Sequence, residues 1–171
     1  MVALGLLILR IVIGLIMAAH GAQKLFGWWG GTGIAGWTGA MKRMRIRPAV
    51  AWAWISILGE FLGGIGLASG LFWPLGSFAI AAAMLVAMAL VHWPKGFWNN
   101  KGGYEFNLSI LAAVTALALT GPGSYSLDSL LRIHLPEPVT LVVGTLATLV
   151  GVGVALGTRS APQVETKREA V

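Results

Sequence analysis

The chain has no cysteine among its 171 residues. This excludes disulfide exchange, thiolate nucleophiles, thiolate zinc sites and iron–sulfur ligation by the chain itself. Charged residues are also scarce, at 11%, against about a quarter in soluble domains. Hydrophobic residues make up 57%, and the mean hydropathy is +0.80. This composition is typical of an integral membrane protein.

Acidic residues are the scarcer charge, with six Asp and Glu against twelve Lys and Arg, and the net charge is +6. A basic balance can indicate nucleic-acid binding, but the basic residues border apolar segments and form no groove-reading motif. We therefore expect no nucleic-acid partner and expect anionic lipid headgroups to provide the counter-charge. In residues 34–45, Ile, Trp and Met alternate with Lys and Arg, which predicts an amphipathic helix lying on such a lipid surface.

Long apolar runs dominate the rest of the chain. A bilayer core of about 30 Å requires about 20 mostly apolar residues in a helix. Five segments approach this requirement: residues 3–26, 49–70, 74–93, 104–120 and 139–157. We expect an all-α integral membrane protein in which residues 1–130 form an antiparallel four-helix bundle. Residues 131–157 would add a fifth membrane-spanning helix, and residues 158–171 a short polar cytoplasmic tail.

Lys and Arg are unequally distributed between the two membrane faces that five alternating helices define. Ten of the twelve lie on the face that contains the ends of the first and third helices and the C-terminal tail. Arg132 lies on the other face, and Arg10 lies within the first helix. Because basic loops of membrane proteins stay in the cytoplasm, we expect the N-terminus outside and the C-terminus in the cytoplasm.

Several short motifs follow one another along the chain. They are "HGAQKLFGWWGG" after the first apolar segment, "LGEFLGG" in the second, "HWPKGF" after the third, "GGYEFNL" at the start of the fourth and "GPGSYSLD" after it. Together they resemble the DoxX family of small bacterial and archaeal membrane proteins, over roughly residues 4–130. The fifth apolar segment departs from the family pattern.

The resemblance implies a four-helix bundle in a bacterial or archaeal plasma membrane. It also implies a link, in some relatives, to the membrane subunits of thiosulfate:quinone oxidoreductase. For other relatives it implies a link to redox complexes with sulfurtransferase or superoxide dismutase partners.

Two ionisable residues lie within the predicted spans. Glu60 is near the middle of the second span, where a carboxylate needs a cationic partner or a proton. Counted from the outer helix ends, Arg10 lies at a similar depth in the first span. This predicts an Arg10–Glu60 ion pair that fastens the two helices together. The alternative is a proton-linked or ligand-binding carboxylate whose ionisation Arg10 controls.

Further polar and aromatic residues converge at one end of the predicted bundle, where the first and third helices end and the second and fourth begin. We assign candidate catalytic roles to His20, His92, Glu60 and Glu105. We assign candidate ligand-binding roles to Arg10, Gln23, Lys24, Trp93, Lys95, Tyr104 and Asn107. Aromatic walls with few polar groups are typical of a site for a flat amphipathic molecule such as a quinone.

Structural roles remain open for these residues. Either histidine can be a hydrogen-bonding residue of the bundle or the membrane interface. Glu105 and Asn107 match ordinary helix-start chemistry. Haem or a metal is disfavoured, because no supporting ligands are recognisable around the histidines.

Two functions of different class are consistent with these patterns. The first is the membrane component of a redox system that binds quinone or a similar molecule, linked to sulfur or oxidative-stress chemistry. The second is a non-catalytic anchor for a soluble redox enzyme or a second membrane subunit, and a small-molecule transporter is a third alternative. Whether the chain is itself an enzyme stays open. Gly-xxx-Gly spacings in residues 59–70 and 153–157 also allow close helix approach, including in a homo-oligomer.

Overall fold

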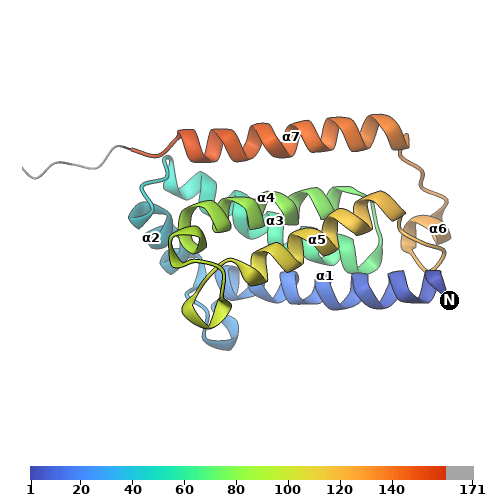
Figure 1. Ribbon diagram of the computed structural model, residues 1–171, viewed down its shortest axis with the longest axis horizontal. Helices are drawn as coiled ribbons and strands as arrows, with labels where there is room; N and C mark the ends of the chain where they lie inside the picture. The colour runs from blue at the N-terminus through green and yellow to red at the C-terminus, as the bar shows by residue number, and fades with distance from the viewer. Residues whose placement is uncertain (161–171) are drawn as a thin grey trace, which may run out of the picture.

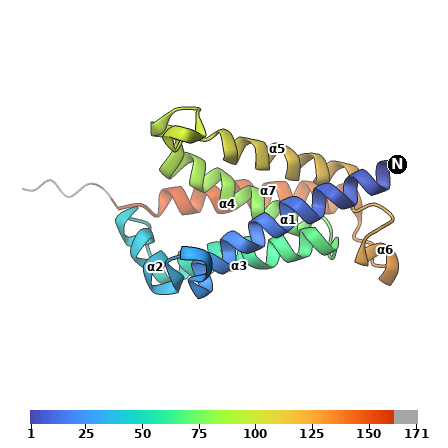
Figure 2. The same cartoon turned by 90° about the horizontal axis from the view of Figure 1, so that it is seen from below.

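The computed structural model describes residues 1–160, which form helices and no β-strand (Figure 1). The long helices match the apolar segments of the sequence to within about two residues at most ends. They are α1 (Val2–Phe26), α3 (Ala49–Ser69), α4 (Leu75–Ala87), α5 (Glu105–Thr120) and α7 (Glu137–Gly157). Two shorter helices, α2 (Gly33–Arg43) and α6 (Leu127–Leu131), lie at opposite ends of the bundle (Figures 1 and 2). We call these ends the α2 end and the α6 end.

Four of the described helices are long and apolar enough to cross a membrane: α1, α3, α7 and α4 with its continuation to Lys95. That continuation is a π-helical turn, η2 (Met88–His92), followed by the short helix η3 (Trp93–Lys95). The fifth apolar helix, α5, has 16 residues and is about 24 Å long, somewhat less than a bilayer core. The protein is therefore a multi-pass, all-α membrane protein.

Close approach between α1 and α3 determines how these two helices face each other. A Cβ added to Gly14 of α1 would overlap the backbone at Gly64 and Ala68 of α3, and a Cβ added to Gly21 would overlap the backbone of Phe61. Small residues at such positions let membrane helices pack backbone to backbone. The contact fixes the register: the second half of α1 lies beside the second half of α3.

The core between the helices is apolar and continuous. It contains Met17, Leu67, Ile80, Met84, Ile110, Val114 and Leu117. At the α2 end, the apolar face of α2 packs on the start of α3, where Met41, Ile46 and Ala53 are buried together. The expectation that α2 rests this face on lipid was therefore wrong, although the helix itself is confirmed. An apolar stripe alone does not reveal whether protein or lipid covers it.

The fifth long helix, α7, lies on the outside of the bundle against α4 (Figure 1). Only Ala155 of α7 is fully buried. Gly144 packs directly against the ring of Phe78 on α4. The C-terminal end of α7 is tied to the α2–α3 connection, because Arg159 Nε donates to the carbonyl of Met44 (3.2 Å) and the Ser160 N–H donates to that of Arg45 (3.0 Å).

The expected close approach through Gly153 and Gly157 has no partner within the described chain. A Cβ at either position would meet nothing within 4 Å. The exposed apolar face of α7 therefore lies in the bilayer, and its use in a homo-oligomer stays a prediction.

Candidate functional site

The centre of the candidate site is an ion pair between α1 and α3. Glu60 is only 3% exposed, and both of its carboxylate oxygens accept hydrogen bonds from Lys24 Nζ, each at 2.5 Å. The α1–α3 register explains the pairing, because Gly21 packs on Phe61 and so places Lys24 one turn further along, within reach of Glu60. Among residues 1–160 this is the only side-chain ion pair.

A tryptophan of α2 covers the lysine of this pair. Lys24 Nζ lies 4.2 Å from the ring centroid of Trp37, a cation–π contact. The indole Nε1 of Trp37 donates to Ser56 Oγ at 2.7 Å, and this hydroxyl donates to the carbonyl of Ala53 at 3.0 Å. Residues of α1, α2 and α3 thus fix the position of the ammonium group.

A cavity of about 240 Å³ opens beside this cluster, between α2, α3, α4 and α7. Its only ionisable lining residues are Lys24 and Glu60, and its other polar-capable groups are the Ser56 hydroxyl and the indoles of Trp37 and Trp52. The rest of the wall is apolar or glycine, and α7 contributes Gly151, Val152 and Ala155 to it. The arrangement places one buried charge pair at the edge of an apolar space.

Trp37 is a site residue that the sequence analysis did not identify. Its position on the apolar stripe of α2 was visible, but the stripe was expected to contact lipid. The cavity wall from α7 was also missed, since this helix carries no ionisable residue between Glu137 and Arg159. No signal in the sequence identifies α4 as its neighbour.

The predicted residues of segment 88–105 hold that segment together instead of lining the cavity. His92 Nδ1 lies 2.7 Å from the carbonyl oxygen of Gly102 and so donates to it. Trp93 stacks on Tyr104 with ring centroids 5.0 Å apart. The Glu105 carboxylate accepts the Asn99 N–H at 3.0 Å. In this contact Glu105, the first residue of α5, binds a backbone N–H just before the helix. The contact resembles the helix-start role that the sequence analysis left open for Glu105.

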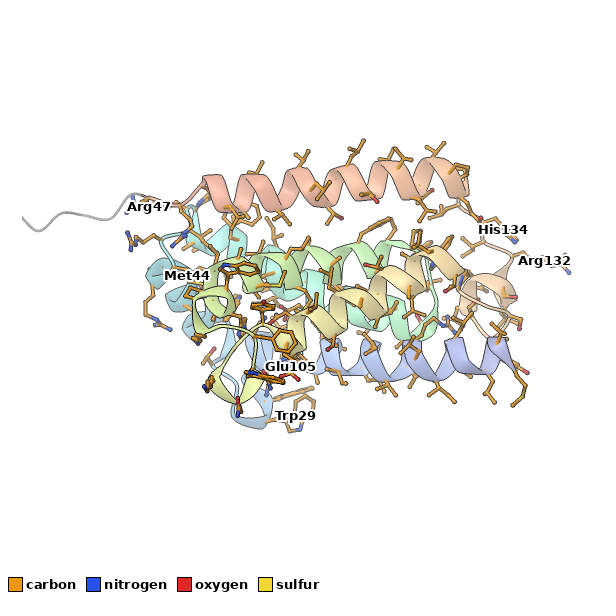
Figure 3. All side chains as sticks on the ribbon, viewed as in Figure 1. Trp29, Met44, Arg47, Glu105, Arg132 and His134 are labelled. Carbon is orange, nitrogen blue, oxygen red and sulfur yellow. The ribbon has the colours of Figure 1, made fainter. Side chains whose placement is uncertain are left out.

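Lys95 and Glu105 lie in the same hairpin-like segment, which projects at the α2 end (Figure 3, Glu105 labelled). The remaining candidates are dispersed. His20 is exposed on α1 beside Phe106 of α5, with ring centroids 6.0 Å apart. Gln23 Nε2 donates to the carbonyl of Trp29 at 3.4 Å.

Asn107 is buried in the core. Its Nδ2 donates to Met84 Sδ at 3.5 Å, whereas its Oδ1 has no partner among the described residues. The cavity beside Glu60 is therefore reached by Lys24 alone among the other predicted residues.

The predicted Arg10–Glu60 pair was wrong. Arg10 is 1% exposed, and its Nη2 donates to the carbonyl of Tyr125 at 2.6 Å, at the α6 end. It lies 14 residues before Lys24, about 21 Å along α1. Depth counted from helix ends missed the α1–α3 register, which brings Arg10 against Gly70 and not against Glu60.

Asp128 completes the polar cluster at the α6 end. Its carboxylate oxygens accept the backbone N–H groups of Phe72 and Trp73, both at 2.8 Å, and thereby anchor α6 to the α3–α4 connection. Its own N–H donates to the carbonyl of Gly70 at 3.1 Å. The motif "GPGSYSLD" contained this residue, but no role was assigned to it because its partners are backbone atoms 55 and 56 residues away.

The helices, the lipid-facing surface and the buried charge pair define a small multi-pass membrane protein with an intramembrane cavity. The DoxX family model matches residues 5–93, which include both residues of the pair. Inner membrane protein YqjF of Escherichia coli (strain K12) is 30% identical over 128 residues, which cover 75% of this chain and 92% of the relative. The chain belongs to the DoxX family. No solved structure matches it significantly.

Proposed function

We propose that the protein is the membrane-embedded component of a redox system and binds a quinone or a similar flat, amphipathic molecule in the cavity between α2, α3, α4 and α7. The observation that carries the proposal is the Lys24–Glu60 pair at the edge of an otherwise apolar cavity. Cavities of this kind, with few polar groups that fix orientation, are typical small-molecule sites.

The residues of the cavity fit such a ligand. Its volume of about 240 Å³ is slightly below the usual range for drug-sized ligands, about 300–1,000 Å³. It therefore suits a single ring whose apolar tail extends into the bilayer. A quinone carbonyl only accepts hydrogen bonds, and the Lys24 ammonium has three N–H donors, of which Glu60 engages two.

In this proposal a bound quinone supplies a two-electron, two-proton acceptor. Lys24 orients it through a carbonyl oxygen, and Glu60 holds the lysine in place and provides a carboxylate oxygen for a proton. Trp37, α4 and α7 exclude water from the pair. His20, His92, Glu105 and Arg10 have no role in the proposal, since none of them lines the cavity.

Electrons would come from a partner, because the chain has no cysteine and its sequence shows no nucleotide or flavin motif. A soluble redox enzyme or a second membrane subunit fits this role. We further propose that the protein resides in the cytoplasmic membrane with its α2 end in the cytoplasm. The basic residues at that end and the name of the relative from E. coli support this location.

The anchor function is the competing proposal. The structure removes the main argument for the transporter alternative. The two ionisable residues within the spans, Arg10 and Glu60, had favoured that alternative. In the structure they do not act together, because Arg10 binds the Tyr125 carbonyl at the α6 end and Glu60 pairs with Lys24. An anchor requires no ligand in the cavity. It predicts a stoichiometric soluble protein after gentle purification.

Two glycines of α7 provide a matched test of ligand binding. Gly151 lines the cavity, Gly153 does not, and a Cβ at either position meets nothing within 4 Å. We expect Gly151→Leu to fill the cavity and weaken the binding of a short-chain quinone analogue at least about tenfold, which corresponds to about 1.4 kcal/mol. Gly153→Leu should bind as the parent does.

Binding would be measured by equilibrium titration in nanodiscs, together with the quinone content of the purified protein. Lys24→Met should also weaken binding, whereas Lys42→Met on the exposed side of α2 should not. Equal affinities for Gly151→Leu and Gly153→Leu would exclude the cavity as the quinone site. Absence of any quinone binding, with a soluble enzyme retained, would favour the anchor function.

A further inference from the structure

The α6 end contains three buried polar atoms without a hydrogen-bond partner among the described residues: Arg10 Nε, Arg10 Nη1 and Ser77 Oγ. Arg10 is 1% exposed and Ser77 is 2% exposed. Residues at 10 and 77 belong to α1 and α4, and the end of α3 lies between them. Buried donors of this kind are costly when unpaired, and a guanidinium more so than a hydroxyl.

Both residues line the same small cavity, which has a volume of about 10 Å³. Its other walls come from the end of α3 and the start of α4, including Leu67, Trp73 and Gly76. The backbone at Gly70 closes it on the Arg10 side, since a Cβ there would overlap the guanidinium. The unpaired atoms and the space therefore coincide.

Size and charge decide which ligand fits. A cavity volume of about 10–15 Å³ holds one water molecule, and a buried water needs at least two polar partners. Chloride and bromide ions are larger than water. Arg10 also shares its cluster with Asp128, whose backbone N–H donates to the carbonyl of Gly70, the residue that packs against the guanidinium. The positive guanidinium and the negative Asp128 carboxylate make the cluster neutral overall. An added anion would leave a net negative charge in the membrane.

We infer that this cavity binds one water molecule, which accepts a hydrogen bond from the Arg10 guanidinium and donates one to Ser77 Oγ. The water joins α1 to α4 where neither side chain reaches the other. It pairs part of the guanidinium that the hydrogen bond from Nη2 to the Tyr125 carbonyl leaves free. The inference is independent of the proposed quinone site, since it concerns the opposite end of the bundle.

Solution NMR of the full chain in nanodiscs, with ¹⁵N-labelled arginine, tests this inference. The Arg10 Nε–H signal is assigned by its loss in Arg10→Lys. We expect a nuclear Overhauser cross-peak between this proton and water, distinguished from proton exchange by its opposite sign in the rotating frame. We expect no shift of the signal when gluconate is replaced by bromide.

Ser77→Val should abolish the cross-peak, because the substitution removes the hydroxyl that binds the water and its methyl groups occupy the space. Ser69→Val is the matched control. Ser69 is the last residue of α3 and also lies at the α6 end, but its hydroxyl already donates to the Ile65 carbonyl. The control should retain the cross-peak. Persistence of the cross-peak in Ser77→Val would overturn the placement of the water.

If Ser77→Val does not fold, the measurements on the parent protein are sufficient to test the inference. Absence of a water cross-peak at Arg10 Nε–H would overturn it. A shift of that signal with bromide would overturn it in favour of an anion site.

Discussion

Replacing Lys24 with methionine leaves the Glu60 carboxylate without its cation. The Glu60 side chain is 4% exposed, and its two oxygens have Lys24 Nζ as their only side-chain partner in the described structure. Removing one member of a buried ion pair costs about 3–5 kcal/mol, because the other charge stays buried and uncompensated. We expect Lys24→Met to lower the free energy of unfolding by an amount in this range.

The reverse change should cost less. The Lys24 side chain is 18% exposed and belongs to the last turn of α1. After Glu60→Gln its ammonium can turn towards water while its stem stays in apolar surroundings. We expect a loss of about 1–3 kcal/mol, the usual cost of a buried polar group left poorly paired. In the double mutant the loss should fall short of the sum by about 1–3 kcal/mol.

Equilibrium unfolding in mixed detergent micelles measures all three variants against the parent. Lys42→Met is the control for loss of one lysine, and it should change stability by less than about 0.5 kcal/mol because Lys42 is exposed on α2. Strictly additive losses for the two single variants would refute the pairing. A greater loss for Glu60→Gln than for Lys24→Met would refute the argument from exposure.

Three further outcomes are expected. Gly64→Ala should lower the free energy of unfolding by about 1–3 kcal/mol, because the added Cβ would overlap the backbone of α1. Gly153→Ala, which has open space around its Cβ, should not lower it, and thermal unfolding of the two variants checks this. Asp128→Ala should cost about 1.5–3 kcal/mol per hydrogen bond to charge that it removes, and faster hydrogen exchange at the two backbone N–H groups of the α3–α4 connection would report it. A single cysteine at position 160 should be protected from impermeant reagents in intact cells and one at position 124 labelled, and the opposite pattern would invert the proposed orientation.

The sequence was sufficient to predict the five long helices and α2, although not the short helix α6. Membrane-spanning helices are local, because each must satisfy its own backbone hydrogen bonds within an apolar run of limited length. The expected segments at residues 49–70 and 104–120 therefore correspond closely to α3 and α5. Lys24 and Glu60 were identified as candidates for the same reason, since a charged residue within or beside an apolar run is conspicuous.

The partner of each charge was decided by the tertiary structure. Arg10 and Lys24 belong to the same helix, and the sequence alone allowed either to approach Glu60. The backbone contact at Gly14 and Gly64 fixes the register of α1 on α3, so that Lys24 reaches Glu60 and Arg10 contacts the loop before α6. Such a register depends on the shapes of both helices together, and neither segment encodes it separately.

The cavity also depended on packing. Its wall from α7 consists of small and apolar residues whose pattern is the same for a lipid-facing, packing or oligomer surface. Hydrogen bonds between the end of α7 and the α2–α3 connection decide which side of the bundle this helix covers. Composition and the length of the apolar runs thus determined a multi-pass helical membrane protein. Non-local contacts decided which charges pair and where the bundle leaves space, because these depend on how separate helices fit together.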